Sequence, residues 1–250
     1  MKKTLLALFT IILSTHLSAQ KIEVSIQANS GLFHYSGNGA ASTSFINSAG
    51  SPQGYTNNPY GNKNGFSYGG DIQAQYVGKT GFIAGLQAGY EILRSKTDIN
   101  AVYPYNVYYF TTGNYYNGPT PAKGQTFLQD QNININPYLG YRLPFKKIKI
   151  DIMPGMDFGI NINSYDKGSA TASDGTVYRV NHKLQKAPTD VRLTLGVAAY
   201  YKKLGIIVGC AHGLVNYTSN LIGMTAGGGS SAPQIVHSEL LRFGISYRVL

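Results

Sequence analysis

The sequence predicts an all-β fold, a single eight-stranded antiparallel up-and-down transmembrane β-barrel. Three observations support this prediction. Apolar and polar residues alternate along eight segments. The connections between these segments are alternately short and long, and the first residues are typical of an exported protein.

The first residues are typical of a secretory signal peptide. Met1 to Lys3 form a short basic region with two lysines. Thr4 to Leu13 form an apolar stretch, and Ser14 to Ala19 form a small and polar region. About ten apolar residues are too few for a membrane-spanning helix, which needs roughly twenty. We therefore expect residues 1–19 to be a signal peptide.

The first four segments alternate with a period of two residues, which is the period of a β-strand. They are Lys21–Ala28, Phe66–Val77, Phe82–Ile92 and Asn132–Arg142. The fourth is the plainest, because Ile133, Ile135 and Leu139 alternate with asparagines.

Four more segments complete the set. They are Ile148–Ile162, Asp190–Tyr201, Gly205–Tyr217 and Leu241–Val249. The register of the seventh is ambiguous, because Ile206, Ile207 and Val208 are consecutive.

The composition of the two faces favours a membrane barrel over a soluble sandwich. The polar face carries Gly, Asn, Gln, Ser and charges of both signs, which suits a packed polar interior. Aromatic residues such as Tyr76, Phe82, Tyr141 and Tyr201 lie near the ends of the apolar stripes, as at a bilayer interface. About eleven tilted residues rise roughly 25 Å, the height of the apolar band of such barrels.

The connections predict the orientation. Three are short: Gly78–Gly81, Leu143–Lys147 and Lys202–Leu204. Four are long: Ser36–Gly65, Thr97–Gln125, Asn163–Thr189 and Thr218–Ile235. Short periplasmic turns and long outer loops are typical of outer-membrane barrels. We expect residues 20–250 to form one multi-pass outer-membrane β-barrel domain with both termini in the periplasm.

With this pattern the chain resembles the small eight-stranded bacterial outer-membrane barrels of OmpA/OmpX-type architecture. Its Asn-, Tyr- and Gly-rich loops are also similar to the PorT-like outer membrane β-barrel domains of Bacteroidota. The C-terminus departs from the usual assembly signal, since Leu250 replaces the final Phe and the outward stripe ends at Val249.

Eight strands enclose a lumen that side chains fill, so we expect no open solute channel. The charged residues predicted to face the lumen are Asp71, Glu91, Asp130, Arg142, Lys149, Asp151, Asp157, Arg192 and Arg242. Isolated charges in such an interior are costly, so these residues are interpreted as a structural network. A gated ion path or a proton relay is the alternative.

The chemistry of the sequence favours a protein without catalytic residues, cofactor or metal. His237 and Ser238 are adjacent, so a strand sends them to opposite faces. Cys210 and His212 share one face and are interpreted as interior packing, with no carboxylate placed by the sequence to orient a histidine. A lipid-modifying enzyme of the outer leaflet and a subunit of a secretion or envelope assembly remain alternatives.

The loops are the candidate contact surface. Tyrosines interleaved with Asn and Gly provide an adaptable contact surface. These tyrosines are Tyr103, Tyr105, Tyr108, Tyr109, Tyr115 and Tyr116. Packing of these tyrosines on one another is the alternative.

The formal net charge is +10, and lysines are expected at the periplasmic turns, namely Lys79, Lys146, Lys147, Lys202 and Lys203. The cations expected near the outer rim are Arg94, Lys96, Lys123, Arg179, Lys183 and Lys186. The expected partners are outer-membrane lipid and lipopolysaccharide, with glycan or protein contact through the loops and no nucleic acid.

Overall fold

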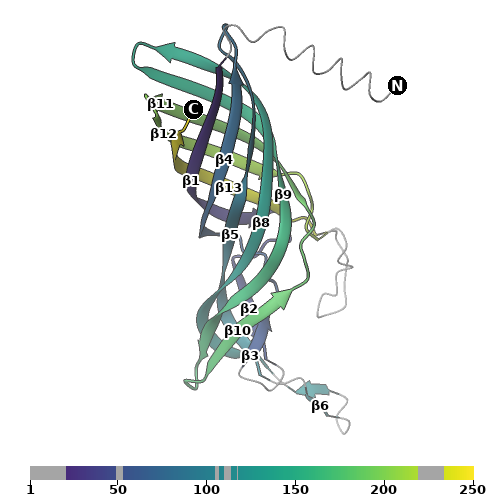
Figure 1. Cartoon of the computed structure of the whole chain (residues 1–250). Coiled ribbons are helices and arrows are strands. Elements are labelled where there is room, and N and C mark those ends of the chain that lie inside the picture. The colour runs from purple at the N-terminus through teal and green to yellow at the C-terminus, as the bar shows by residue number, and fades with distance from the viewer. Residues whose placement is uncertain (1–20, 49–52, 105–106, 110–113, 117, 219–233) are drawn as a thin grey trace, which may run out of the picture.

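The computed structural model describes residues 21–48, 53–104, 107–109, 114–116, 118–218 and 234–250 (Figure 1). The predicted signal peptide, residues 1–19, lies outside them. The all-β prediction is confirmed for these residues, which form strands and no helix. None of them belongs to a helix that is long and apolar enough to cross a bilayer.

Eight strands pair in a closed antiparallel cycle. They are β1 (Lys21–Ser36), β4 (Lys63–Val77), β5 (Phe82–Tyr103), β8 (Thr120–Phe145), β9 (Ile148–Ala172), β11 (Asp190–Tyr201), β12 (Leu204–Gly213) and β13 (His237–Arg248). Each strand pairs with the next, and β13 pairs with β1 to close the ring. A closed ring leaves no unpaired edge within it.

Three further strands correct the prediction of a single eight-stranded barrel, because the described sheet has eleven strands. They are β2 (Thr43–Asn47), β3 (Gln53–Thr56) and β10 (Val177–Leu184). Strand β2 pairs with β5, β3 with β2, β10 with β3, and β10 with β9. Together with the ends of β5, β8 and β9 they close a second ring, which we call the outer unit (Figure 1).

The predicted loops Thr97–Gln125 and Asn163–Thr189 are therefore largely strand. Strand β5 stays paired with β8 as far as Val102 opposite Thr120, and β9 continues to Ala172. The next segment, β10, folds back on β9. A separate hairpin, β6 (Val107–Tyr109) and β7 (Asn114–Tyr116), lies between β5 and β8.

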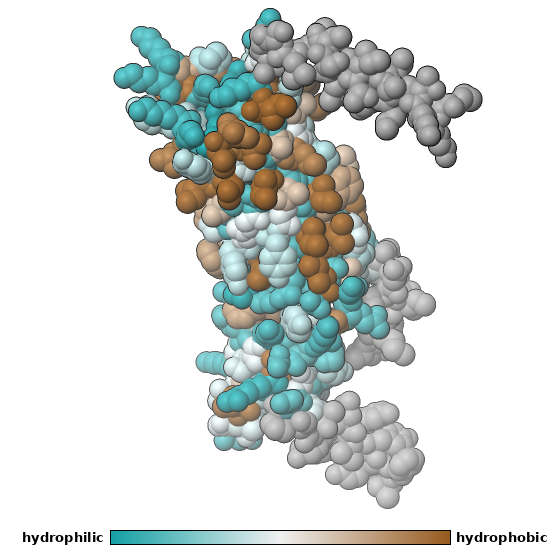
Figure 2. Space-filling view, in the orientation of Figure 1, coloured by the Kyte–Doolittle hydropathy of each residue, from teal (hydrophilic) through white to brown (hydrophobic). Residues whose placement is uncertain are grey.

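A belt of exposed apolar side chains surrounds the eight-stranded ring. Ile206 and Ile245 are each 66% exposed, which is unusual for isoleucine in a folded protein. Other members of the belt are Ile22, Ile26, Phe66, Ile72, Leu86, Ile133, Leu139, Ile152, Leu195, Val208 and Phe243. Figure 2 shows these brown side chains gathered over the half of the molecule away from the outer unit, whose surface is mainly teal.

The apolar side of the strands inverts where the belt ends. In the belt, Leu86 and Tyr90 of β5 point outward, whereas farther along the same strand Ile99 and Val102 point inward and are buried. The outward positions there are taken by Arg94 and Lys96. The outer unit thus has a polar surface and an apolar core. The core consists of Ile46, Ile99, Val102, Ala122, Ala170, Ala172 and Val180.

The seventh strand has a single register. Ile206 and Val208 are exposed, and Ile207 between them is 6% exposed and faces the lumen. Inward glycines make room for large lumen side chains on the neighbouring strands. A Cβ added at Gly85 would come within 2.4 Å of the ring of Tyr138.

Candidate functional site

A first charge cluster fills the lumen near the short turns. Arg142 Nη2 lies 2.7 Å from Glu23 Oε2, and Arg142 Nε lies 2.6 Å from Asp151 Oδ1. Arg248 Nε lies 3.1 Å from Glu23 Oε2, and its guanidinium stacks over the ring of Tyr200 at 3.6 Å. Two arginines and two carboxylates compensate one another here, as buried charges require.

A second charge cluster crosses the lumen toward the outer unit. Arg192 Nη2 and Arg242 Nη2 reach the two oxygens of Glu91 at 2.5 Å and 2.6 Å. The same two arginines lie 3.2 Å and 3.1 Å from Asp157 Oδ2. Asp190 adds a third carboxylate, 3.6 Å from Arg192 Nε.

Neutral polar side chains fill the space between the two clusters. Tyr138 donates a hydrogen bond to Gln75 Oε1 at 2.8 Å, and Gln73 Nε2 lies 2.5 Å from the Tyr138 hydroxyl oxygen. The cavity that remains beside Gln27 and Asn136 is about 40 Å³. This volume suits a few water molecules at most, since one water takes roughly 30 Å³ of liquid.

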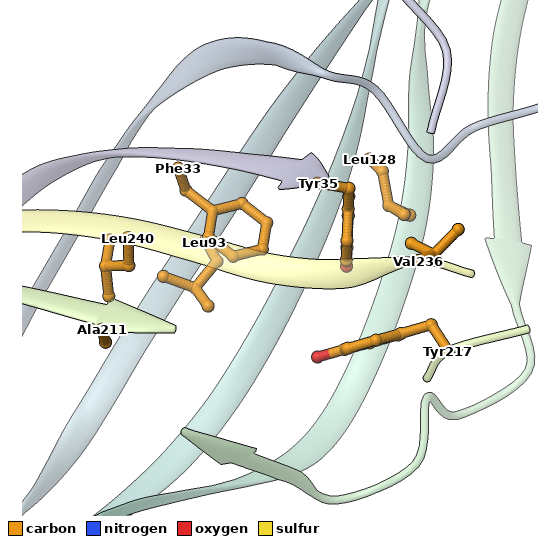
Figure 3. Close-up of a cluster of buried hydrophobic side chains, with 8 residues drawn as sticks. All are labelled: Phe33, Tyr35, Leu93, Leu128, Ala211, Tyr217, Val236 and Leu240. Atoms are coloured by element: carbon orange, nitrogen blue, oxygen red, sulfur yellow. The ribbon is translucent and has the colours of Figure 1, made fainter. Parts of the chain in front are cut away.

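An apolar cluster follows at the mouth of the barrel (Figure 3). It consists of Phe33, Tyr35, Leu93, Leu128, Ala211, Tyr217, Val236 and Leu240. The rings of Tyr35 and Tyr217 meet edge to face with centroids 5.1 Å apart. Figure 3 shows side chains from β1, β5, β8, β12 and β13 gathered in this cluster together with Tyr217 and Val236.

The charged residues predicted for the lumen fall into three groups: members of the two ion clusters, residues with hydrogen bonds alone, and one exposed residue. Arg142 and Asp151 lie in the first cluster, and Glu91, Asp157, Arg192 and Arg242 lie in the second.

Asp71 and Asp130 face the lumen without joining either ion cluster. Asp71 accepts hydrogen bonds from Asn29 and Asn134, and Asp130 accepts them from Tyr35 and Ser164.

Lys149 corrects the prediction. It is exposed at the start of β9 and makes no ion pair within the described ranges. The position is the second residue of its strand, so its side chain reaches water rather than the packed interior.

Sequence reasoning missed three members of these clusters, Glu23, Asp190 and Arg248. All three occupy polar positions of alternating segments, so the period itself contained the signal. Their partners come from strands distant in sequence, and alternation alone does not identify partners.

The predicted tyrosine loop is only partly described. Tyr103 lies at the end of β5, and its ring packs on Phe45 with centroids 4.5 Å apart. Tyr108 pairs with Tyr115 in the β6–β7 hairpin, which also contains Tyr109 and Tyr116. Tyr105 lies outside the described residues.

Cations cover the outward face of the strands above the belt. Cross-strand registers place the following residues on this face: Lys63, Arg94, Lys96, Lys123, Lys167, Arg179 and Lys183. One carboxylate, that of Asp98, lies on the same face and accepts a hydrogen bond from Lys63. That bond, more than any other contact, lowers the pKa of Asp98. We call this set the cationic collar.

A buried carboxylate lies inside the outer unit. Asp166 accepts hydrogen bonds from Thr56 N at 2.7 Å and from Thr56 Oγ1 at 2.9 Å. Burial raises the pKa of Asp166 above its ordinary value, although both hydrogen bonds oppose the shift. Tyr60, at the base of the outer unit, has its pKa raised to about 12 by burial.

A polar cluster on the outer wall overturns the interpretation of Cys210 and His212 as interior packing. Cys210 and His212 point outward from β12 and do not pack in the interior, and His212 is 57% exposed. A carboxylate does orient that histidine, because Glu239 Oε1 lies 2.7 Å from His212 Nδ1. Glu239 comes from the neighbouring strand β13, a pairing that the sequence does not disclose.

The opposite orientations of His237 and Ser238 are confirmed. Ser238 is buried and donates to Asp190 Oδ2 at 2.6 Å, whereas His237 faces outward. Ser36 donates to Glu239 Oε1 at 3.0 Å. Within the described part of the chain, no group of three His, Cys, Asp or Glu side chains has the geometry to hold a metal ion.

No protein-family model matches the chain, and no curated protein matches it. Several solved structures do. Ail, the attachment invasion locus protein of Yersinia pestis, in complex with the heparin analogue sucrose octasulfate, has 9% identity and a TM-score of 0.33, over 91% of this chain and 99% of its own. Neisserial surface protein A has 14% identity and a TM-score of 0.34, over 90% and 96%.

The toluene transporter TodX of P. putida is also similar, with 10% identity and a TM-score of 0.26, over 94% of this chain and 91% of its own. At these values the matches establish no family. The description of the barrel rests on the strand pairing and on the burial of the side chains.

Proposed function

We propose that the chain is a non-enzymatic integral outer-membrane β-barrel protein that is closed to solutes. It displays the outer unit at the cell surface, where it has a structural or contact role. Residues 1–19 direct export and are removed, and residues 20–250 form the barrel with both termini in the periplasm.

The exposed apolar belt is the observation that carries this proposal. Isoleucines that are two-thirds exposed on a closed sheet are unfavourable in water and favourable in lipid. The inversion of the apolar side at the level of Arg94 then marks the outer limit of the bilayer. Beyond this level the outer unit has the apolar core and polar surface of a water-exposed domain.

The filled lumen supports a barrel without a solute path. Two ion clusters, a layer of amides and the apolar cluster around Tyr35 and Tyr217 follow one another along the axis. An ion that entered would have to displace compensated charges and then cross an apolar layer, which is costly. We therefore assign these charges a structural role.

The cationic collar supports contact with anionic lipopolysaccharide at the outer leaflet. In the collar, seven cations and one carboxylate face outward on the strands that run from the edge of the belt into the outer unit. Each cation near an anionic membrane surface contributes about 1 kcal/mol of attraction. The β6–β7 hairpin, with its tyrosines, extends from this side as a contact element for glycan or protein.

Expression in a Gram-negative host followed by membrane fractionation tests the proposal. We expect the chain in the outer-membrane fraction, resistant to carbonate extraction, with Gln20 as its first residue. In planar bilayers the purified barrel should insert without opening conducting steps. Recovery in the soluble periplasmic fraction would contradict the membrane assignment, and steady conductance would contradict the closed lumen.

A further inference from the structure

A pocket lies between the apolar cluster at the barrel mouth and the connection from β10 to β11. Its volume is about 370 Å³, within the range of small-molecule sites, which is roughly 300–1,000 Å³. Leu184, the last residue of β10, and Ala187 of the connection pack on the apolar cluster. Ala187 N donates a hydrogen bond to Asn161 Oδ1 at 3.2 Å, so this wall of the pocket is attached to β9.

The pocket has an exposed rim and a buried end. Gln185, Lys186 and Pro188 line the rim and are exposed, so the pocket opens to solvent beside the β10–β11 connection. Asp130 and Ser164 line the buried end, with 3% and 2% exposure. The side chains between the two are aromatic or apolar, and they include Tyr35, Tyr60, Tyr217, Leu128 and Leu184.

The carboxylate of Asp130 is buried without a cation. One of its oxygens accepts a hydrogen bond from the Tyr35 hydroxyl and the other accepts one from Ser164, and both donors are neutral. A carboxylate oxygen has two lone pairs, so each oxygen keeps one acceptor position. Among the described residues, no Lys, Arg or His forms an ion pair with Asp130. A buried charge in this situation is costly unless it acquires a partner.

The second charge cluster does not supply the missing cation. Three carboxylates already share its two arginines, Arg192 and Arg242. One of the three, Asp190, interacts repulsively with Asp130. When all these groups are ionised, this end of the lumen has a surplus of negative charge, whereas the first cluster is balanced. A proton or the cation of a ligand can remove the surplus.

The tyrosine rings also suit a cation. The ring of Tyr35 meets those of Tyr60 and Tyr217 edge to face, with centroids 5.2 Å and 5.1 Å away (Figure 3 shows Tyr35 and Tyr217). Aromatic rings attract ammonium groups, and apolar walls favour a ligand with a hydrocarbon body. A bare metal ion does not fit, because the described residues offer no three His, Cys, Asp or Glu side chains arranged to hold one.

Lys186 at the rim is the group that opposes a positively charged ligand. It is exposed, so water and salt screen its charge, whereas charges interact more strongly at the buried Asp130. The cations of the collar face outward from the strands, and Asp130 faces inward. The buried carboxylate therefore decides the sign of the ligand.

We propose that this pocket binds a small organic ammonium cation with an apolar body. The ammonium group donates hydrogen bonds to Asp130, and the body lies along the tyrosine rings and the side chains of Leu128 and Leu184. The inference goes beyond the proposed function. It requires the folded barrel but not its position in a membrane.

Nuclear magnetic resonance titration of the purified barrel in a non-ionic detergent tests the site. The probes are 2-phenylethylamine, the isosteric but neutral 2-phenylethanol, and the anion phenylacetate. We expect the amine to bind about tenfold more tightly than the alcohol, as a hydrogen bond to a charged group provides. Equal binding of the amine and the alcohol, or tighter binding of phenylacetate, would overturn the proposal.

A pair of matched variants locates the ammonium group. Asp130→Asn keeps the shape of the side chain and should remove the preference for the amine over the alcohol. Asp71→Asn is the control, because Asp71 is also buried and bonded to neutral donors but does not line this pocket. Both variants are measured in the same micelles, so partitioning of the amine into detergent cancels. An unchanged preference in Asp130→Asn, or an equal loss in both variants, would contradict the assigned role of Asp130.

Two further substitutions test the walls and the rim. Ala187→Phe should fill the pocket and weaken binding of both the amine and the alcohol, whereas Ala74→Phe, at an exposed position of β4, should not. Lys186→Ala should retain or tighten binding of the amine, and weaker binding would contradict the assigned sign of the ligand. The comparison of probes on the wild type needs no variant, so a variant that misfolds leaves the test intact.

Discussion

Arg192 of β11 and Glu91 of β5 meet inside the barrel with 2.5 Å between Nη2 and Oε1, although β8 and β9 lie between their strands in the ring. This ion pair therefore bridges the lumen and does not merely connect neighbouring strands. Arg192 is fully buried and also contacts Asp157. Its positive charge, together with that of Arg242, compensates these two buried carboxylates.

Replacing Arg192 by alanine is expected to destabilise the barrel by about 3–5 kcal/mol, because the buried Glu91 and Asp157 then share Arg242 alone. Chemical unfolding of the protein in detergent measures the change. Lys123→Ala, an exposed cation of the collar, is the control and should change stability by less than about 0.5 kcal/mol. Equal midpoints for Arg192→Ala and the wild type would contradict the structural role of this cluster.

A charge in the belt should oppose membrane insertion. Leu86→Arg places a cation at a position that is 47% exposed, in the middle of the outward apolar stripe of β5 between Phe82 and Arg94, with an expected cost of about 2–4 kcal/mol. The yield of folded barrel in liposomes, measured by its altered electrophoretic mobility before heating, should fall. Gln125→Arg, outward on β8 above the belt, should insert like the wild type. Identical yields for the two variants would place the bilayer elsewhere.

The outer unit should lose stability independently of the ring below it. Ile46 is fully buried in the apolar core of the outer unit, so Ile46→Ala is expected to cost about 2–5 kcal/mol there. Hydrogen exchange should quicken in β2, β3 and β10 and stay slow in β11 to β13. Uniformly faster exchange would mean that the two rings unfold as one unit.

The stability of the outer unit should depend on pH through Asp166. Burial raises the pKa of its carboxyl in the folded state, so folding favours the protonated form. This contribution is complete below the unfolded pKa, about 3.9, and is lost as the pH rises through the higher folded pKa. Protease cleavage of the outer unit should therefore increase with pH across this window.

Asp166→Asn is the matched variant, because the amide is neutral at every pH. Its outer unit should show a flatter dependence of cleavage on pH than the wild type. A wild-type dependence that persists in Asp166→Asn would assign the effect to another group.

The β6–β7 hairpin should be separable from the barrel. Replacing residues 105–117 by a short Gly-Ser turn preserves Tyr103 and its contact with Phe45, so the ring and the outer unit should fold normally. If the hairpin is the contact element, binding of producing cells to glycan arrays or host cells should be lost. Full binding after the replacement would exclude the hairpin as the contact surface.

Much of the eight-stranded ring was predictable because alternation is a local property. Each residue faces in or out according to its neighbours along the strand, so Ile206 and Leu86 could be assigned to the belt once a register was chosen. The continuation of β5, β8 and β9 was missed for a related reason. The period of two persists beyond Arg94, but the apolar side switches, and a search for one continuous stripe ends at the switch.

The candidate sites depended on pairing between distant segments. His212 and Glu239 are 27 residues apart and Arg192 and Glu91 are 101 apart, and their contacts follow from the register and closure of the ring. The sequence by itself determined which residues alternate, where the turns are short and which face is apolar, because these depend on neighbouring residues. Only the tertiary structure decided the second ring, the partners of the buried charges and the pairing of His212 with Glu239, because strand stagger brings those side chains together.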